Sequence, residues 1–421
     1  MLLVSDINNN LEKISSSLLK RNIDVKDKLL EIIEADNLRR STQSELDNLL
    51  AESNKLAKEI GNLFKSGEAE KASQLKEKAS SLKPQSKLIS DKLSEINEKL
   101  NSLLLDIPNV PNDLVPSGST EGDNLEIFKH GEIPVLQDNA LPHWELASKF
   151  NIIDFDLGNK ITGAGFPVYK NKGAKLQRAL INYFIDKNTD AGYKEIQVPI
   201  LINEDSGTGT GQLPDKEGQM YHVTGDNLYL APTAEVPVTN IFRNSIIKSS
   251  DLPVCLTSYT PCFRREAGSY GSHVRGLNRL HQFDKVEIVR IEKAENSYNA
   301  LEQMIDHVKS ILEELELPFR ILRLCGGDLG FTSSLTYDFE VYSAAQKKWL
   351  EVSSVSNFET FQSNRLKLRI DDNGNKSLAH TLNGSSLALP RIVACLLENF
   401  QTESSIKIPK VLVNYTGFEE I

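Results

Sequence analysis

The residues best suited to bind an anionic substrate gather between positions 261 and 287. Residues 261–271 read Pro-Cys-Phe-Arg-Arg-Glu-Ala-Gly-Ser-Tyr-Gly, and Arg275 follows shortly. A guanidinium group can donate two parallel hydrogen bonds to a phosphate or a carboxylate, and glycines let the backbone come close to a ligand. Arg264 and Glu266 would fit an ion-pair cluster at the surface equally well, so this segment alone leaves both interpretations open.

Three other patterns argue against common kinds of site. The glycine-rich stretch at 206–211 lacks the Gly-Lys-Ser/Thr ending of a nucleotide-binding P-loop. His222, His273 and His281 do not share the spacing of metal ligands on one helix. The four cysteines form no C-x2-C pair, so neither a structural zinc site nor a disulfide framework is expected.

A helical hairpin is the clearest element that the sequence predicts. One apolar stripe with heptad-like spacing runs from about residue 27 to Ser66-Gly67, and a second covers residues 75–103. Two such stripes around one short turn are typical of an antiparallel coiled coil. Pro84, inside the second stripe, is expected to kink its helix or to mark a local defect. The stripe residues are Ile32, Ala35, Leu46, Leu49, Leu56, Ile60, Leu63, Leu75, Ala79, Leu82, Ile89, Leu93, Ile96, Leu100 and Leu103.

The length and charge of this hairpin leave its role open. Roughly 38 residues at about 1.5 Å each make an arm about 57 Å long, more than packing requires. Basic and acidic residues balance over residues 1–105, 17 against 17, so the net charge of -10 falls entirely on the rest of the chain. This balance permits contacts with RNA phosphates, but a solvated coiled-coil surface explains the lysines equally well.

The rest of the chain predicts an α+β domain. Short apolar runs suited to strands occur at 195–202, 286–291 and 349–353. Helical stretches occur at 174–187, 294–315 and 390–400. Such a mixture is typical of a mainly antiparallel sheet with helices interspersed.

The chain length of 421 residues favours more than one domain. We expect a helical hairpin domain at 1–106, which begins with a short amphipathic helix within 1–24. A Pro/Gly/Ser-rich linker and junction follow at 107–132, and the α+β domain occupies 133–421. No apolar run approaches the roughly 20 residues of a membrane span, and the N-terminus does not resemble a signal peptide. A cytoplasmic protein without membrane association is therefore expected.

Several segments, in order, resemble the class II aminoacyl-tRNA synthetases. Phe263-Arg264-x-Glu266 between two predicted strands resembles motif 2 of that class. The helix and strand ending at Pro199 resemble motif 1, which forms the dimer interface, and residues 383–391 resemble motif 3.

Within that class, several sequence segments are similar to those of seryl-tRNA synthetases of bacterial type. The segments that carry this resemblance, besides the hairpin, are Thr-Ala-Glu at 233–235, Gly-Ser-Tyr-Gly-Ser-His-Val-Arg at 268–275, His-Gln-Phe-Asp-Lys-Val-Glu at 281–287 and Glu-Val-Ser-Ser at 351–354. The resemblance extends over essentially the whole chain.

The resemblance implies a role for each residue of an ATP site. Arg264 would contact the α-phosphate and the serine carboxylate, and Arg275 the outer phosphates. Glu266 would lie at the adenine, which Phe283 and Arg391 would sandwich. The remaining residues that it places in the ATP site are Arg265, Glu351, Val352, Ser353 and Ser354.

Glu351 and Ser354 would also hold the Mg²⁺ that accompanies ATP, because this ion prefers hard oxygen ligands. Without the resemblance, Glu-Val-Ser-Ser would be read as an edge strand with polar alternation. Rate would come from Arg264, Arg275 and Glu351 through positioning and charge neutralisation, without a general base.

The serine pocket implied by the resemblance is hydrogen-bonding in character. Its residues would be Thr233, Ala234, Glu235, Arg264, Glu287 and Ser385. Groups aimed at the serine hydroxyl would be left unpaired by alanine, which penalises that substrate strongly. An acidic side chain would also give the substrate ammonium a partner.

The implied reaction is the formation of seryl-adenylate from L-serine and ATP, followed by transfer to tRNA(Ser) in a homodimeric enzyme. Whether tRNA(Sec) is also charged stays open. Two alternatives are a synthetase-like paralogue with another acceptor and a non-enzymatic coiled-coil protein. Ser386 and Pro390 stand where the family usually has glycine, and Ser386 is expected to crowd the approach to the ligand.

Overall fold

The computed structural model describes residues 1–266 and 275–421, which form two compact units. The helical unit comprises Leu2–Leu19 and Ile23–Pro108, and the sheet unit comprises Met1, Lys20–Asn22 and Asn109–Ile421. The predicted fold class, a helical hairpin and an α+β domain around a mainly antiparallel sheet, is confirmed.

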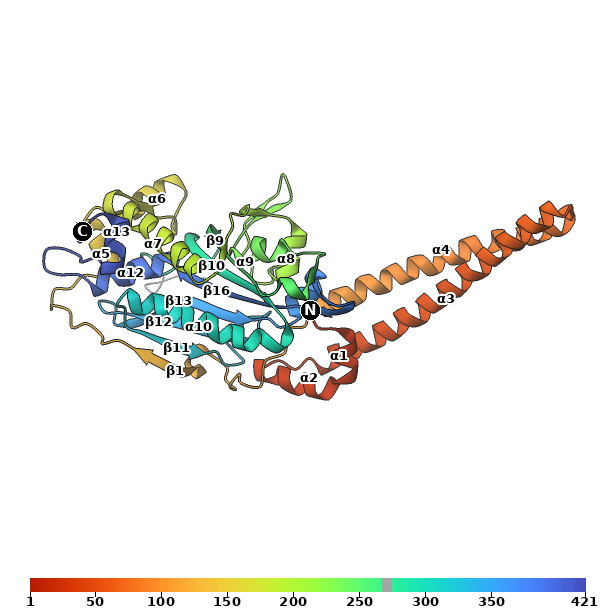
Figure 1. Cartoon of the computed structure of the whole chain (residues 1–421), viewed down its shortest axis with the longest axis horizontal. Coiled ribbons are helices and arrows are strands. Elements are labelled where there is room, and N and C mark those ends of the chain that lie inside the picture. The colour runs from red at the N-terminus through yellow and green to blue at the C-terminus, as the bar shows by residue number, and fades with distance from the viewer. Residues whose placement is uncertain (267–274) are drawn as a thin grey trace. The chain divides into compact units, whose positions relative to one another are not determined.

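The helical unit is built on two long helices, α3 (Lys26–Lys65) and α4 (Ala69–Leu105), which run side by side (Figure 1). The turn between them contains Gly67 at a φ of +79°, a conformation that favours glycine. The short amphipathic helix expected within 1–24 is present as α2 (Leu11–Leu18). Another short helix, α1 (Val4–Asn9), precedes it, because the backbone leaves the helical conformation at Asn10.

The seam of the hairpin is the one that the heptad pattern predicts. Every residue of the two predicted stripes is buried or half-buried. Ion pairs flank the seam, from Lys99 to Glu31 at 2.8 Å and from Lys78 to Glu52 at 2.9 Å. The helix α4 continues through Pro84, whose ring is exposed.

The sheet unit is organised around one eight-stranded sheet with the strand order β1-β11-β12-β13-β16-β10-β9-β4. Within this sheet, β4 and β9 pair in parallel and the other neighbouring strands are antiparallel. The strands are β1 (Leu125–His130), β4 (Lys194–Glu195), β9 (Val254–Phe263), β10 (Gln282–Glu292), β11 (Phe319–Arg323), β12 (Leu335–Ser343), β13 (Lys348–Asn357) and β16 (His380–Ala388).

Three small sheets, nine α-helices and several one-turn 3-10 helices complete the described part of this unit. The small sheets contain β2 (Ile153–Asp154) and β3 (Val168–Tyr169); β5 (Leu201–Ile202), β6 (His222–Val223) and β7 (Leu228–Leu230); and β8 (Ile246–Lys248), β14 (Arg369–Asp372) and β15 (Asn375–Leu378). The helices are α5 (His143–Lys149), α6 (Phe155–Ile161), α7 (Asn171–Asp190), α8 (Glu204–Thr210), α9 (Glu235–Asn240), α10 (Ser297–Glu314), α11 (Phe361–Leu366), α12 (Leu389–Asn399) and α13 (Lys410–Thr416).

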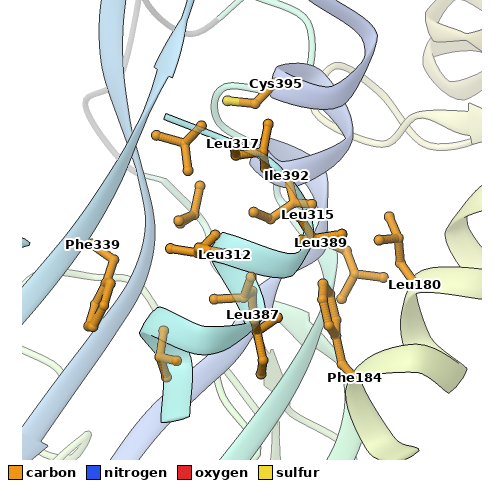
Figure 2. Packing of buried hydrophobic residues seen from close by; sticks show 14 of the residues in the cluster. Leu180, Phe184, Leu312, Leu315, Leu317, Phe339, Leu387, Leu389, Ile392 and Cys395 are labelled. Carbon is orange, nitrogen blue, oxygen red and sulfur yellow. The ribbon is translucent and has the colours of Figure 1, made fainter. Parts of the chain in front are cut away.

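The main core lies where α7, α10 and α12 pack against the sheet. Figure 2 shows Leu180 and Phe184 of α7 close to Leu387 and Leu389, at the junction of β16 and α12. Because strand side chains alternate between the two faces, burial of Val286 and Ile288 in this core turns their β10 neighbours to the opposite face. That opposite face carries the candidate site.

Two expected elements differ from the structure, and the glycine-rich stretch forms a helix. The expected strand at 195–202 is split into β4 and β5, because Pro199 cannot donate to a ladder. Residues 107–132, expected as linker and junction, also contribute β1, which pairs with β11. The glycine-rich stretch at 206–211 lies mostly in the helix α8, which ends at Gly211 with a φ of +91°.

Among the described residues, no helix combines the length and the apolar character that a membrane span requires.

Candidate active site

The motifs singled out in the sequence lie on neighbouring strands. The segment Phe263–Glu266 begins at the end of β9, Glu287 lies on β10, and Ser385 lies directly opposite Glu287 on β16. Residues 233–235 lie at the start of α9, which contacts β10. Segments far apart in the sequence therefore meet on one face of the sheet.

The predicted serine-binding residues form a buried polar cluster, the proposed serine pocket. The Thr233 hydroxyl lies 3.2 Å from Glu287 Oε2, and Asn383 Nδ2 donates to Glu287 Oε1 at 3.2 Å. Glu235 accepts a hydrogen bond from Gln362 Nε2 at 2.6 Å. The side chains of Thr233, Glu235, Glu287 and Ser385 are all less than a tenth exposed, and Ala234 is fully buried.

A lysine that the sequence analysis did not assign completes this pocket. Lys285 Nζ lies 2.5 Å from Glu287 Oε2 and 2.9 Å from the Thr233 hydroxyl. The alternation of β10 could have identified it, because Phe283, Lys285 and Glu287 must share one face. Gln362 and Asn383 were also missed, and Gln362 lies in a helix without any motif.

The two carboxylates of the pocket are electrostatically unlike. Burial, reinforced by the charge of Glu287, raises the pKa of Glu235 to about 7. Burial also raises the pKa of Glu287, but the ammonium of Lys285 and its hydrogen bond oppose that effect.

Arg264 lies beside this cluster, close enough for its charge to act on Glu235 and Glu287. Its guanidinium lies over the Phe283 ring, 5.3 Å from the centroid, and its Nε donates to the Pro232 carbonyl at 3.4 Å. The fork of Arg264 is thus adjacent both to an aromatic face and to the backbone just before Thr233.

Arg391 and Glu351, two further predicted ATP-site residues, contact each other. Arg391 Nη1 donates to the Glu351 carbonyl at 2.7 Å and lies 3.4 Å from its carboxylate. Arg391 Nε donates to the Asn278 carbonyl at 3.0 Å. The structure therefore brings together Arg391, from the segment that resembles motif 3, Glu351 on β13, and Asn278, which follows the segment that resembles motif 2.

Glu351 and Ser354 share a face although they are three residues apart, a spacing that normally places side chains on opposite faces. A register shift explains this: Ser354 and Ser353 pair with Asp338 and Phe339, whereas Glu351 pairs with the next residue, Glu340. The reading of this segment as an edge strand is wrong, because β13 lies between β12 and β16.

The side chains of Val352 and Ser353 do not lie on the face that Glu351 and Ser354 share. Val352 belongs to the main core, and the Ser353 hydroxyl donates to the Ser385 carbonyl at 2.5 Å.

Asp338 is a carboxylate beside this pair that the sequence analysis did not consider. Burial, together with the charge of Glu351, raises its pKa well above the ordinary value, while a hydrogen bond from Ser354 opposes the effect. Its Oδ1 atom is buried and has no hydrogen-bond partner among the described residues. Among residues 1–266 and 275–421, no group of three or more His, Cys, Asp or Glu side chains is arranged to hold a metal ion.

The remaining predicted ATP-site residues, Arg265, Glu266 and Arg275, flank positions 267–274. These positions, which include Gly268, Gly271 and His273, lie outside the described residues. Glu266 forms an ion pair with Arg279. The Arg265 backbone N–H donates to the Gln219 carbonyl at 2.9 Å. The guanidinium of Arg275 covers the Trp144 ring at 4.9 Å from its centroid.

Ser386 was expected to crowd the approach to the ligand, but it does not. Its side chain is fully buried and donates to Asn188 Oδ1 of α7 at 2.7 Å, on the side away from the pocket that Ser385 lines. Pro390 occupies the first turn of α12, where a missing N–H does no harm.

Comparison with known proteins identifies the relatives of this chain. A family model of the seryl-tRNA synthetase N-terminal domain matches residues 1–111, and one of the class II tRNA synthetase core domain (G, H, P, S and T) matches residues 221–400. The serine–tRNA ligase of Salinibacter ruber is 46% identical over all of this chain and 99% of its own length. That of Nautilia profundicola is 46% identical over 96% of this chain and 98% of its own.

A solved structure agrees with these sequence relatives. The crystal structure of seryl-tRNA synthetase from Pyrococcus horikoshii complexed with ATP is 32% identical, with a TM-score of 0.91 over all of this chain and 99% of that one.

Proposed function

The chain belongs to the seryl-tRNA synthetase family, and from this premise we propose that it activates L-serine with ATP and transfers the seryl group to the 3′ end of tRNA(Ser). The observation that carries the proposal is the buried pocket of Thr233, Glu235, Glu287 and Ser385 beside the guanidinium of Arg264. Carboxylates and the Ser385 hydroxyl suit the ammonium and hydroxyl of serine, and an arginine fork suits its carboxylate.

The first reaction step needs positioning rather than a covalent nucleophile. The serine carboxylate attacks the α-phosphorus of ATP, its oxygen forms the new P–O bond, and pyrophosphate leaves. Arg264 would neutralise charge on both groups and hold them together, since it lies between the pocket and the Phe283 ring. In the second step, a hydroxyl of the terminal adenosine attacks the acyl carbon and AMP leaves.

The adenine would lie between Phe283 and Arg391. In the structure Arg264 covers the Phe283 ring, so ATP would take over this aromatic face while the guanidinium turned to the phosphate. Arg391 is held by Glu351 and Asn278, which supports a fixed guanidinium plane suited to stacking. Glu266 and Arg275 would approach the nucleotide from either side of positions 267–274, with Arg265 beside them.

Mg²⁺ would be held by Glu351 and Ser354 together with phosphate oxygens. The donor set fits this ion, since a carboxylate and a hydroxyl share one face and the unpartnered Asp338 oxygen lies close behind. When bound, the ion would neutralise phosphate charge in the site.

The other proposed partners are a second copy of the chain and the tRNA. The hairpin of α3 and α4 would bind the tRNA. The surface around α7 and β4 would form the dimer interface. The hollow of about 730 Å³ lined by Tyr169, Gln177 and Arg178 supports this, because the Tyr169 hydroxyl is buried without a partner among the described residues.

Serine-dependent exchange of pyrophosphate into ATP, followed by charging of tRNA(Ser), tests the proposed function. We expect Arg264→Ala to reduce exchange at least about 100-fold without changing the thermal unfolding midpoint. Arg369→Ala, an exposed position on β14, is the matched control.

Three outcomes would contradict parts of this proposal. Wild-type protein without exchange would refute serine activation. Exchange without charging would indicate the paralogue with another acceptor, and tRNA(Sec) is tested in the same charging assay. Normal exchange by Arg264→Ala would remove Arg264 from the reaction centre.

A further inference from the structure

Lys285 places a buried positive charge inside the pocket at the reaction centre. It is 6% exposed, and its position on β10 lies between Phe283 and Glu287 on the same face of the sheet. Full burial of a lysine is rare unless the ammonium has partners. Here the partners are Glu287 Oε2 at 2.5 Å and the Thr233 hydroxyl at 2.9 Å.

The hydrogen bonds of Thr233 leave its hydroxyl fully occupied. The oxygen accepts from Lys285 Nζ and from the Glu235 backbone N–H at 3.2 Å, and the hydroxyl proton goes to Glu287 Oε2 at 3.2 Å. A hydroxyl has one donor and two acceptor sites, so this hydroxyl has none left for a substrate. Thr233 therefore acts on a ligand only through its backbone or through Glu287.

Glu287 keeps capacity on one oxygen only. Its Oε2 atom accepts from Lys285 and Thr233, whereas Oε1 accepts one hydrogen bond, from Asn383 Nδ2 at 3.2 Å. A carboxylate offers about four lone-pair sites, which leaves Oε1 able to accept one more donor. Lys285 and Thr233 thus fix which oxygen faces the pocket.

The charges around Glu287 make Lys285 decisive for its ionisation. The titratable groups that face it are Lys285 on its own strand, Glu235 from α9, Arg264 at the end of β9 and the Cys262 thiol of β9. Gln362 of α11 and Asn383 and Ser385 of β16 are uncharged. Two carboxylates buried in one pocket disfavour each other's charged form unless a cation intervenes.

We propose that Lys285 is a positioning residue of the serine site, which keeps Glu287 ionised and turns its Oε1 atom toward the polar groups of serine. This inference rests on the proposed function. With Lys285 in place, its ammonium offsets the burial of Glu287, and an anionic oxygen remains for the serine ammonium. Without it, the cation that opposes the effect of burial on Glu287 is lost, and the protonated form of that carboxyl is favoured.

Steady-state pyrophosphate exchange from pH 6 to pH 9 tests this role, with serine and ATP varied separately. We expect Lys285→Met to lower kcat/KM for serine at pH 7 about 10- to 100-fold, with KM for ATP changed less than about twofold. The deficit should shrink toward pH 9, where Glu287 ionises again, and the apparent pKa of kcat/KM should rise by at least about one. Lys285→Arg should restore the wild-type profile in part.

Lys293→Met is the matched control, because Lys293 forms its ion pair with Asp372 outside the pocket. Lys285→Gln is a second neutral variant in case Lys285→Met does not fold. Wild-type kcat/KM and pH profile in either neutral variant would overturn the role of Lys285. So would an equal loss at every pH, or unfolding of both neutral variants, since either would make Lys285 merely structural. Absence of exchange by the wild type would refute the proposed function instead.

Discussion

At the scale of single residues, the pocket holds two glutamates in different states. Glu235 is 6% exposed and accepts a hydrogen bond from the neutral Gln362, whereas Glu287 has the ammonium of Lys285 at 2.5 Å. The pKa of Glu235 rises to about 7, through burial and the charge of Glu287. The two carboxylates are therefore expected to respond differently to pH.

Glu235→Gln should remove one pH-dependent contribution to stability. The folded-state pKa of about 7 lies above the ordinary glutamate value of 4.5, so Glu235 favours folding below about pH 4.5, and this contribution is lost as the pH rises through 7. The free energy of unfolding of the wild type should thus fall relative to Glu235→Gln by up to about 3 kcal/mol between pH 5 and pH 8.

Denaturant unfolding followed by tryptophan fluorescence measures this difference, since Trp144 and Trp349 both lie in the sheet unit. Glu403→Gln, at an exposed position, is the control. Parallel pH curves for the wild type and Glu235→Gln would mean that Glu235 is already ionised at pH 5.

Which residues lie together was predictable where a motif specified them, and the detailed geometry was not. Thr233, Glu235, Glu287 and Ser385 do gather in one pocket. The shared face of Glu351 and Ser354 depends on a register shift that no spacing rule reveals. Lys285 was overlooked although β10 alternates regularly, because a lysine between strand residues is usually solvated.

At the scale of elements, a buried network fixes the chain that returns after residues 267–274. The Leu277 backbone N–H donates to His143 Nε2 at 2.8 Å, so the ring proton lies on Nδ1, 2.7 Å from Glu398 Oε1 of α12. Gln346 Nε2 donates to the same Glu398 oxygen at 2.9 Å, and its Oε1 accepts from Asn278 at 2.8 Å. This network holds the segment next to Arg275 and Arg391.

Gly276→Ala should disturb that network. Gly276 has a φ of +69°, and an added Cβ would lie 2.3 Å from Nε2 of the fully buried His143. Backbone strain of about 1–2 kcal/mol and overpacking of about 1–3 kcal/mol should lower stability, and displacement of Arg275 should raise KM for ATP about tenfold.

Gly417→Ala separates the two costs. Its φ is +72°, but no atom lies within 4 Å of the added Cβ, so only the strain remains. Unfolding midpoints and KM for ATP should be measured for both variants. Equal effects would show that contact with His143 does not matter.

Long elements were easier to predict than short ones. The period of the apolar residues predicted α3, α4, α7 and α12 to within a few residues. The strand β1 was missed inside a Pro/Gly/Ser-rich stretch, because its residues are mostly exposed at the sheet edge and bury no alternating face.

At the scale of the whole molecule, the two units divide the charge and the chemistry. Every residue proposed to contact serine or ATP belongs to the sheet unit, which carries a net charge of −7 (33 basic and 40 acidic residues), whereas the helical unit carries −3. Within the helical unit, α3 and α4 are close to neutral, with 14 basic and 13 acidic residues, and their lysines are exposed. A polyanionic tRNA would thus meet less repulsion on the hairpin.

Shortening the hairpin should separate charging from activation. The pairs of Glu31 with Lys99 and Glu52 with Lys78 show a constant register, in which residues 45 and 85 lie opposite each other. Deleting residues 46–84 and joining 45 to 85 through a Gly/Ser turn therefore keeps the seam at the base intact. We expect tRNA(Ser) charging to fall at least about 100-fold, since phosphate contacts along the arm are lost.

Serine-dependent pyrophosphate exchange should stay within about twofold of the wild type, because no residue of the proposed reaction centre is removed. The control carries the same Gly/Ser turn in place of Ser66–Glu68 on a full-length arm. Loss of exchange by a folded deletion variant would assign the arm a part in activation. Normal charging would instead place recognition of the acceptor in the sheet unit, which would leave the length of the coiled coil without a function in this reaction.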